Sequence, residues 1–302
     1  MLLSASKSKK DIFYLMNKYS GIVSRVETEM LLEYLFNCAK LDLYTRNFIV
    51  NEAIEELYDS LIERHIGGEP SQHITGHAEF MGLDFIVTKD TFIPRPETEI
   101  LVNEILTLCS TCPVPLWYGV RCAPVRILDI CTGCGNIAVS LAKSMPEADI
   151  IATDISEDAL RIAEKNAGWH SVSERIKFYK GNVFNALMFV KNPKFDIIIC
   201  NPPYIKDAEI PFLQKEVRRE PEIALNGGED GLDFYRIIAS QAHRYVERRG
   251  TILLEIGFGQ GQAVKDIFSS YSTFEIYKIV EDFNNIERVI WFKMKTSINF
   301  TN

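Results

Sequence analysis

The sequence predicts an α/β protein in which a mostly parallel sheet, covered by helices on both faces, follows a smaller helical region. Between residues 125 and 256, five short apolar segments alternate with helical patterns, as strands buried on both faces do. Between residues 11 and 66 the apolar residues recur at helical spacing instead. The stretch 75–94 joins these regions, and its short apolar runs, broken by Gly76 and Gly82, predict a β-hairpin.

The elements follow from these patterns in chain order. The first region has its clearest helix in the apolar residues from Phe48 to Ile66, with Gly67 and Gly68 suited to end it. We therefore expect a helical domain over residues 1–74, a hairpin linker over 75–94 and a larger domain over 95–302. The five parallel strands are expected at 125–130, 149–153, 176–179, 195–200 and 251–256. Runs 273–279 and 286–292 are joined by a polar stretch too short for a crossover helix, so they should pair antiparallel.

Composition limits the class of protein. At about 150 residues per domain, 302 residues suggest two domains. The 33 basic against 41 acidic residues give a net charge of −8, which argues against a protein that coats nucleic acid. Seven cysteines, an odd number, favour a reducing compartment. Because there is no signal peptide and no apolar run near the roughly 18 residues that span a bilayer, we expect a cytoplasmic protein without membrane contact.

The first chemical motif is a loop of small residues that follows the strand at 125–130. Such a loop, leading into a helix, lets backbone N–H groups approach a ligand. Asp154 stands at the end of the next strand, where a carboxylate can accept hydrogen bonds from both hydroxyls of a ribose. The third glycine of dinucleotide-binding loops is missing, so the pattern favours S-adenosylmethionine; an ordinary glycine-containing turn is the alternative. The residues of this loop are Cys131, Thr132, Gly133, Cys134 and Gly135.

The second motif ends the buried strand at 195–200 with Asn201, Pro202, Pro203 and Tyr204. Both prolines fix φ and lack an N–H group, so the loop is rigid and presents carbonyl groups. The Asn201 side-chain oxygen and the Pro202 carbonyl can accept both hydrogens of a target NH₂ group, on which Tyr204 can stack. This arrangement predicts methyl transfer to a planar NH₂ group. Its alternative is a proline-rich strand terminator.

With these motifs in place, the chain resembles the HemK/PrmC-type glutamine-N5 methyltransferases, which modify peptide chain release factors. The segments that carry the resemblance are 68–82, 92–99, 201–204, 220–232 and 255–261. The resemblance implies a seven-stranded Rossmann-like, S-adenosylmethionine-dependent methyltransferase domain behind an N-terminal substrate-docking domain. It also implies a class 1 release factor as partner, methylated on the glutamine of its Gly-Gly-Gln motif, and we expect the enzyme to be a monomer.

The resemblance also assigns residues. It places the loop from Cys131 to Gly135, together with Asp154, Asn182 and Val183, at the cofactor, with Val183 on the adenine side. Asn201 to Tyr204 would hold the substrate glutamine, with Asn201 also bordering the cofactor.

Two features depart from the family pattern. Cys131 replaces the usual first glycine of the loop, and the connection 109–124 is longer than usual, with no role that we can assign.

Two other functions compete with this interpretation. An adenine-N6 DNA methyltransferase holds its target NH₂ group with the same kind of loop, but the charge of −8 disfavours a nucleic-acid substrate. A non-catalytic zinc-binding module would use Cys109, Cys112, Cys131 and Cys134, whose spacing suits four thiolates. The second cysteine pair lies in the cofactor loop, so we expect no metal.

Overall fold

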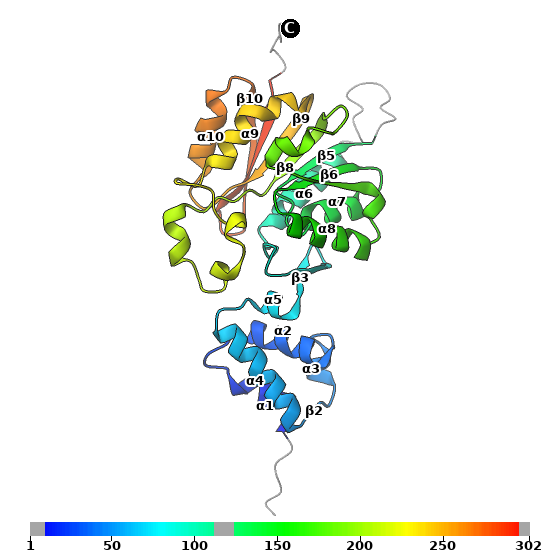
Figure 1. Ribbon diagram of the computed structural model, residues 1–302, viewed down its shortest axis with the longest axis vertical. Coiled ribbons are helices and arrows are strands. Elements are labelled where there is room, and N and C mark those ends of the chain that lie inside the picture. The colour runs from blue at the N-terminus through cyan, green and yellow to red at the C-terminus, as the bar shows by residue number, and fades with distance from the viewer. Residues whose placement is uncertain (1–9, 112–123, 296–302) are drawn as a thin grey trace, which may run out of the picture. The chain divides into compact units, whose positions relative to one another are not determined.

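The computed structural model describes residues 10–111 and 124–295. The chain divides into two compact units (Figure 1). Unit 1 contains the residues up to His77 together with Gln214–Arg219, and unit 2 contains Ala78–Leu213 and the residues from Glu220 onward. Most of the predicted connection 109–124 lies outside the described residues.

Unit 1 is helical, as the apolar spacing predicts. Its helices are α1 (Ile12–Lys18), α2 (Arg25–Phe36), α3 (Asp42–Thr45), α4 (Glu52–Ile66) and α5 (Ser71–Thr75). The residues Lys10–Asp11 (β1) and Ile49–Val50 (β2) pair antiparallel, so the predicted helical pattern is wrong at Phe48 and Ile49. The physical reason is the Asn51 side chain, which accepts a hydrogen bond from the Ile54 N–H and starts α4 only after it.

The distant segment Gln214–Arg219 packs with unit 1 at the end of α4. Gly68 has a φ of 91°, and a Cβ there would lie 3.0 Å from the Lys215 Cβ, so the close approach requires glycine. The Arg219 guanidinium donates to the Gly67 carbonyl at 3.3 Å.

The predicted hairpin is present. Strands β3 (His77–Phe80) and β4 (Leu83–Ile86) pair with each other, and Met81 and Gly82 between them both have positive φ. Two consecutive residues with positive φ are typical of the tight turn that joins hairpin strands.

Unit 2 is built on a seven-stranded sheet in the order β10-β11-β9-β8-β5-β6-β7. The strands are β5 (Arg126–Ile130), β6 (Asp149–Asp154), β7 (Ile176–Lys180), β8 (Phe195–Cys200), β9 (Val246–Glu255), β10 (Phe274–Glu281) and β11 (Glu287–Met294). Strands β5 to β9 are mutually parallel, and β11 runs antiparallel to both β9 and β10, which confirms the predicted pairing of the last two strands. Strand β9 begins five residues earlier than predicted, where Val246 pairs with Phe195 across an irregularity.

Helices cover both faces of this sheet (Figure 1). The helices are α6 (Thr98–Thr111), α7 (Asn136–Ser144), α8 (Glu157–Trp169), α9 (Asp233–Gln241) and α10 (Gly261–Ser270). Short 3-10 helices lie at Ser173–Arg175, Val183–Leu187, Asp207–Phe212, Val217–Arg219, Glu222–Ala224 and Ala242–Arg244. No helix in the described part of the chain has the length and apolar character to cross a membrane.

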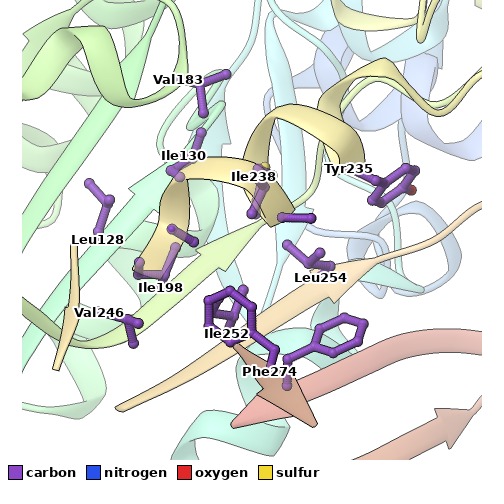
Figure 2. Packing of buried hydrophobic residues seen from close by; sticks show 14 of the residues in the cluster. Leu128, Ile130, Val183, Ile198, Tyr235, Ile238, Val246, Ile252, Leu254 and Phe274 are labelled. Carbon is purple, nitrogen blue, oxygen red and sulfur yellow. The ribbon is translucent and has the colours of Figure 1, made fainter. Parts of the chain in front are cut away.

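Successive strand residues enter two different cores, because side chains alternate across a sheet. In β8, Ile198 packs with α9 and α10, whereas Ile197 packs with α6, α7 and α8. Figure 2 shows the first of these cores, where Ile238 of α9 lies with Ile252 and other strand residues. Both faces of the central strand β8 are therefore buried, which explains why all but one of its residues are apolar.

Candidate active site

The sheet has a topological switch point between β5 and β8. These strands are parallel neighbours, and the chain continues from β5 towards β6 and β7 but from β8 towards β9. Ligands of open α/β sheets bind at the carboxyl ends of the strands at such a point. Ile130 of β5 pairs with Cys200 of β8, so the two predicted loops begin side by side there.

The loop after β5 adopts a conformation that demands small residues. Cys131, Gly133 and Gly135 have φ values of 60°, 56° and 83°. A Cβ on Gly135 would lie 2.9 Å from the Ala163 Cβ, so only glycine lets α7 begin this close to α8. The loop is closed by a hydrogen bond of 2.8 Å from the Gly135 N–H to the Thr132 carbonyl.

Asp154 ends β6 and holds the loop. Its two carboxylate oxygens accept hydrogen bonds of 2.9 Å from the backbone N–H groups of Gly133 and Ser156. Burial raises the pKa of Asp154, and these backbone N–H groups lower it. Each oxygen keeps a further lone pair, so the carboxylate can still accept hydroxyl hydrogens.

Asn182 and Val183 follow β7 and lie next to Asp154. The Gly181 N–H donates to the Asp154 carbonyl at 2.9 Å. Val183 is buried with a φ of 47°, which is rare for a β-branched residue, whereas Asn182 is exposed.

Two predicted loop residues point their side chains into the protein instead. The Thr132 hydroxyl donates to Asp129 at 2.6 Å, and Cys134 is buried among apolar side chains. Cys131 packs against the core that contains α9, so Cys131 and Cys134 enter different clusters. Burial raises the pKa of the Cys134 thiol to about 12, which disfavours the thiolate that zinc needs. The described residues hold no group of three or more side chains suited to a metal ion, and Cys112 lies outside them.

Asp129 is a candidate residue that the sequence patterns did not single out. It is fully buried in β5, and its Oδ1 has no hydrogen-bond partner. Burial raises the pKa of Asp129 to about 7. The hydrogen bond from Thr132 lowers this pKa, and the nearby charge of Asp154 raises it. The sequence signal that could have identified Asp129 is a charged residue within an otherwise apolar strand.

The loop after β8 is held rigidly by its neighbours. Pro202 and Pro203 are buried, and the Gln260 side chain donates to the Tyr204 carbonyl at 2.9 Å. A Cβ on Gly227 would lie 2.7 Å from the Tyr204 Cα, so this glycine allows a second backbone to pack directly on the loop. Segments 201–204, 227–231 and 257–260 therefore form one packed cluster.

Asn201 is partly exposed and is oriented by a partner from α6. Its Nδ2 donates to the Thr98 hydroxyl at 3.0 Å, so its Oδ1 is the end of the amide that is available to a ligand.

A buried carboxylate fixes the segment that leads into α6. Glu220 accepts a hydrogen bond of 2.8 Å from the Ile93 N–H and forms an ion pair with Arg95. Burial raises the pKa of Glu220, while Arg95 lowers it. The two segments 92–99 and 220–232, which lie far apart in the sequence, thus meet at one contact.

Two family profiles match the chain. The profile described as "PrmC N-terminal domain" matches residues 23–76, and "Methyltransferase small domain" matches residues 120–230.

Curated relatives match over most of their length. A release factor glutamine methyltransferase of Thermodesulfovibrio yellowstonii is 37% identical over 97% of this chain and 100% of its own. The corresponding protein of Geobacter sulfurreducens is 39% identical over 88% of both chains. That of Agrobacterium fabrum is 40% identical over 78% of both.

Solved structures share the fold at lower identity. The human methyltransferase 10 domain containing protein is 15% identical, with a TM-score of 0.52 over 72% of this chain and 90% of its own. The hMettl16 catalytic domain, in complex with an RNA hairpin, is 15% identical, with a TM-score of 0.54 over 72% of this chain and 78% of its own. The fold is therefore that of a methyltransferase, and the relatives' identity over nearly full length shows that this chain belongs to the release factor glutamine methyltransferase family of enzymes.

Proposed function

We propose that this enzyme transfers a methyl group from S-adenosylmethionine to the side-chain amide nitrogen of the glutamine in the Gly-Gly-Gln motif of class 1 release factors. The observation that carries the proposal is the position of the Asn201 amide. Its nitrogen donates to Thr98, which leaves its oxygen available to a ligand, and the Asn201 loop begins beside the glycine loop at the switch point.

The residues at the switch point fit the proposed cofactor. Asp154 would accept hydrogen bonds from the ribose hydroxyls, and Asn182 and Val183 would border the adenine. The buried Asp129 carboxylate, with one unpartnered oxygen, suits a ligand that carries positive charge. S-adenosylmethionine supplies, when bound, a methyl group made electrophilic by its sulfonium.

The protein's own residues would then position the nucleophile. The Asn201 Oδ1 and the Pro202 carbonyl each accept one hydrogen of the target NH₂ group, and Tyr204 packs on its plane. Fixing both hydrogens directs the nitrogen lone pair and removes the entropy cost of orienting it at the moment of transfer. The nitrogen becomes strongly acidic once it carries the methyl group, so no strong base is required.

The proposal extends to partner and setting. Unit 1 would dock the folded release factor and contribute binding energy remote from the reacting nitrogen. The enzyme would act in the cytoplasm as a monomer without direct contact to nucleic acid.

The test is mass spectrometry of a purified release factor after incubation with the enzyme and S-adenosylmethionine. One added methyl group on the Gly-Gly-Gln glutamine is the expected result. Asn201→Ala should slow transfer by roughly a hundredfold or more, with much less change in cofactor affinity. Methylation of adenine in DNA, with the release factor unmodified, would instead support the DNA methyltransferase alternative.

A further inference from the structure

A buried carboxylate lies beside the Asn201 loop without an assigned role. Glu255 ends β9, the neighbour of β8, and the register that pairs Cys200 with Leu254 brings it next to Asn201. Glu255 is 3% exposed, and its Oε2 has no hydrogen-bond partner. Burying a carboxylate that is only partly satisfied is costly, so its retention at this place calls for an explanation.

Thr98 connects Glu255 to Asn201. Thr98 is 1% exposed, and its hydroxyl accepts a hydrogen bond of 3.0 Å from the Asn201 Nδ2. The same hydroxyl interacts with the Glu255 carboxylate and favours its charged form. Tyr204 of the same loop approaches from another side, with its hydroxyl 3.5 Å from the Glu255 Oε1.

The number of protons that Glu255, Thr98 and Asn201 have available decides the direction of the hydrogen bonds between them. A threonine hydroxyl has a single proton, and a carboxylate can only accept. When Thr98 donates its proton to Glu255, it can only accept from Asn201, so the NH₂ end of the amide must face Thr98. The Asn201 Oδ1 is then left for the substrate.

Without the carboxylate this preference disappears. The hydroxyl could then rotate and donate to the Asn201 Oδ1, which would turn the NH₂ end of the amide outward. That end is a donor and cannot accept a hydrogen from the target NH₂ group.

We propose that Glu255 is a positioning residue that acts through the Thr98 hydroxyl to keep the acceptor end of the Asn201 amide directed at the substrate. This inference rests on the proposed function. Glu255 itself does not touch the reacting atoms.

The surroundings of Glu255 set the pH range of this effect. Burial raises the pKa of Glu255 to about 7, as does the nearby charge of Glu97, while Thr98, Arg288 and Tyr204 lower it. The Tyr235 hydroxyl faces the same residue but donates to its backbone carbonyl, at 2.9 Å. Since only the ionised carboxylate enforces the direction, the transfer rate should rise as the pH increases through about 7.

The experiment compares Thr98→Val, Thr98→Ser and Glu255→Gln with the wild-type enzyme, using an intact release factor as substrate. Thr98→Val and Glu255→Gln should lower kcat by roughly tenfold and remove its rise near pH 7, with KM and cofactor affinity changed by less than about twofold. Thr98→Ser retains the hydroxyl and should keep both the rate and the pH profile.

Thr251→Val is a matched control. Thr251 on β9 is buried, as Thr98 on α6 is, but its hydroxyl donates to the Phe292 carbonyl at 3.0 Å, away from the loop. The substitution should leave the kcat profile as in the wild type. The proposal is overturned if Thr98→Val keeps the wild-type kcat and pH dependence, or if the variants lose cofactor affinity as strongly as kcat.

A second measurement separates this inference from the proposed function. In the wild type, the NMR signals of the Asn201 side-chain NH₂ group should shift between about pH 6 and about pH 8, and Glu255→Gln should abolish the shift. If the wild type does not methylate the release factor, the proposed function fails, whereas an NMR shift that persists in Glu255→Gln refutes the link to Glu255.

Discussion

At the residue scale, Cys131 departs from the expected pattern in a way that backbone geometry explains. Its φ of 60° lies in the left-handed region, where a side chain costs about 1–2 kcal/mol and glycine costs little. Replacing Cys131 with glycine should therefore relieve backbone strain.

We therefore predict that Cys131→Gly keeps cofactor binding and changes stability by between zero and about +1 kcal/mol, because relief of strain exceeds the added freedom of the unfolded chain. Urea unfolding and calorimetric titration measure the two quantities. Cys134→Gly is the control: this thiol is buried and packs against apolar residues, so its loss should destabilise the protein by about 1–3 kcal/mol. A destabilised Cys131→Gly would show that the thiol contributes packing.

Asp154 should be essential to cofactor affinity for two reasons. It is the expected acceptor for the ribose hydroxyls, and it anchors the Gly133 N–H. Asp154→Ala should therefore weaken S-adenosylmethionine binding by about 1.5–3 kcal/mol in calorimetry. Asp149→Asn, at the other end of the same strand, should leave the affinity unchanged. An Asp154→Ala variant with wild-type affinity would remove this residue from the site.

At the element scale, Glu220 determines how the segment before α6 is held. Its carboxylate bonds a backbone N–H and pairs with Arg95, and its residue is only 5% exposed. Because α6 carries Thr98, displacement of this segment should reach the Asn201 loop.

Glu220→Gln should destabilise the protein by about 2 kcal/mol, since it leaves Arg95 without its charge partner. It should also lower kcat, because the Thr98 hydroxyl would be less well placed. Chemical denaturation and steady-state kinetics measure these effects. Asp230→Asn breaks an exposed ion pair with Arg236 and should cost less than about 0.5 kcal/mol. Equal losses in both variants would contradict the structural role of Glu220.

At the scale of the whole molecule, the two units should respond to pH in opposite directions. In unit 2, burial raises the pKa of both Asp129 and Glu255 to about 7. A group whose pKa is raised in the folded state stabilises fully below its unfolded pKa and loses that contribution as the pH rises through the folded value. For Glu255 this lowers the free energy of unfolding by on the order of 3 kcal/mol between pH 4.5 and 7.

Unit 1 contains the opposite case. Burial alone would raise the pKa of Glu29, but Lys40 and other partners hold it at about 2. Hydrogen bonds from Lys10 and Lys18 lower the pKa of Glu55 to about 2. The stabilisation that Glu29 and Glu55 give the folded state is present above pH 4.5 and is lost as the pH falls towards 2.

Hydrogen exchange followed by NMR, which reports on each unit separately, should reveal this difference. From pH 5 to 8, protection in the unit 2 strands should fall while unit 1 stays nearly constant, and from pH 5 to 3 unit 1 should weaken. Glu255→Gln should reduce the loss of hydrogen-exchange protection in the unit 2 strands at high pH. A parallel response of the two units would contradict these assignments.

Local sequence patterns were sufficient for most of the fold. The alternation of apolar strands with helices predicted the strands of the large sheet, the final antiparallel pair and the hairpin, because each depends on residues a few positions apart. It failed at Ile49, where helical spacing continued across the residue that starts the helix. Patterns also identified the two loops at the switch point, since positive φ and paired prolines require particular residue types.

The sequence by itself thus determined the elements of this protein and the two loops, whereas the tertiary structure decided which side chains support them. Glu220 and Arg95 pair across 125 positions, and Asn201 and Thr98 bond across 103. Such contacts leave no periodic trace, because they depend on the order of strands in the sheet and not on neighbours in the chain. The direction of the Asn201 amide, on which our mechanism depends, could therefore be inferred only once Thr98 and Glu255 were seen beside it.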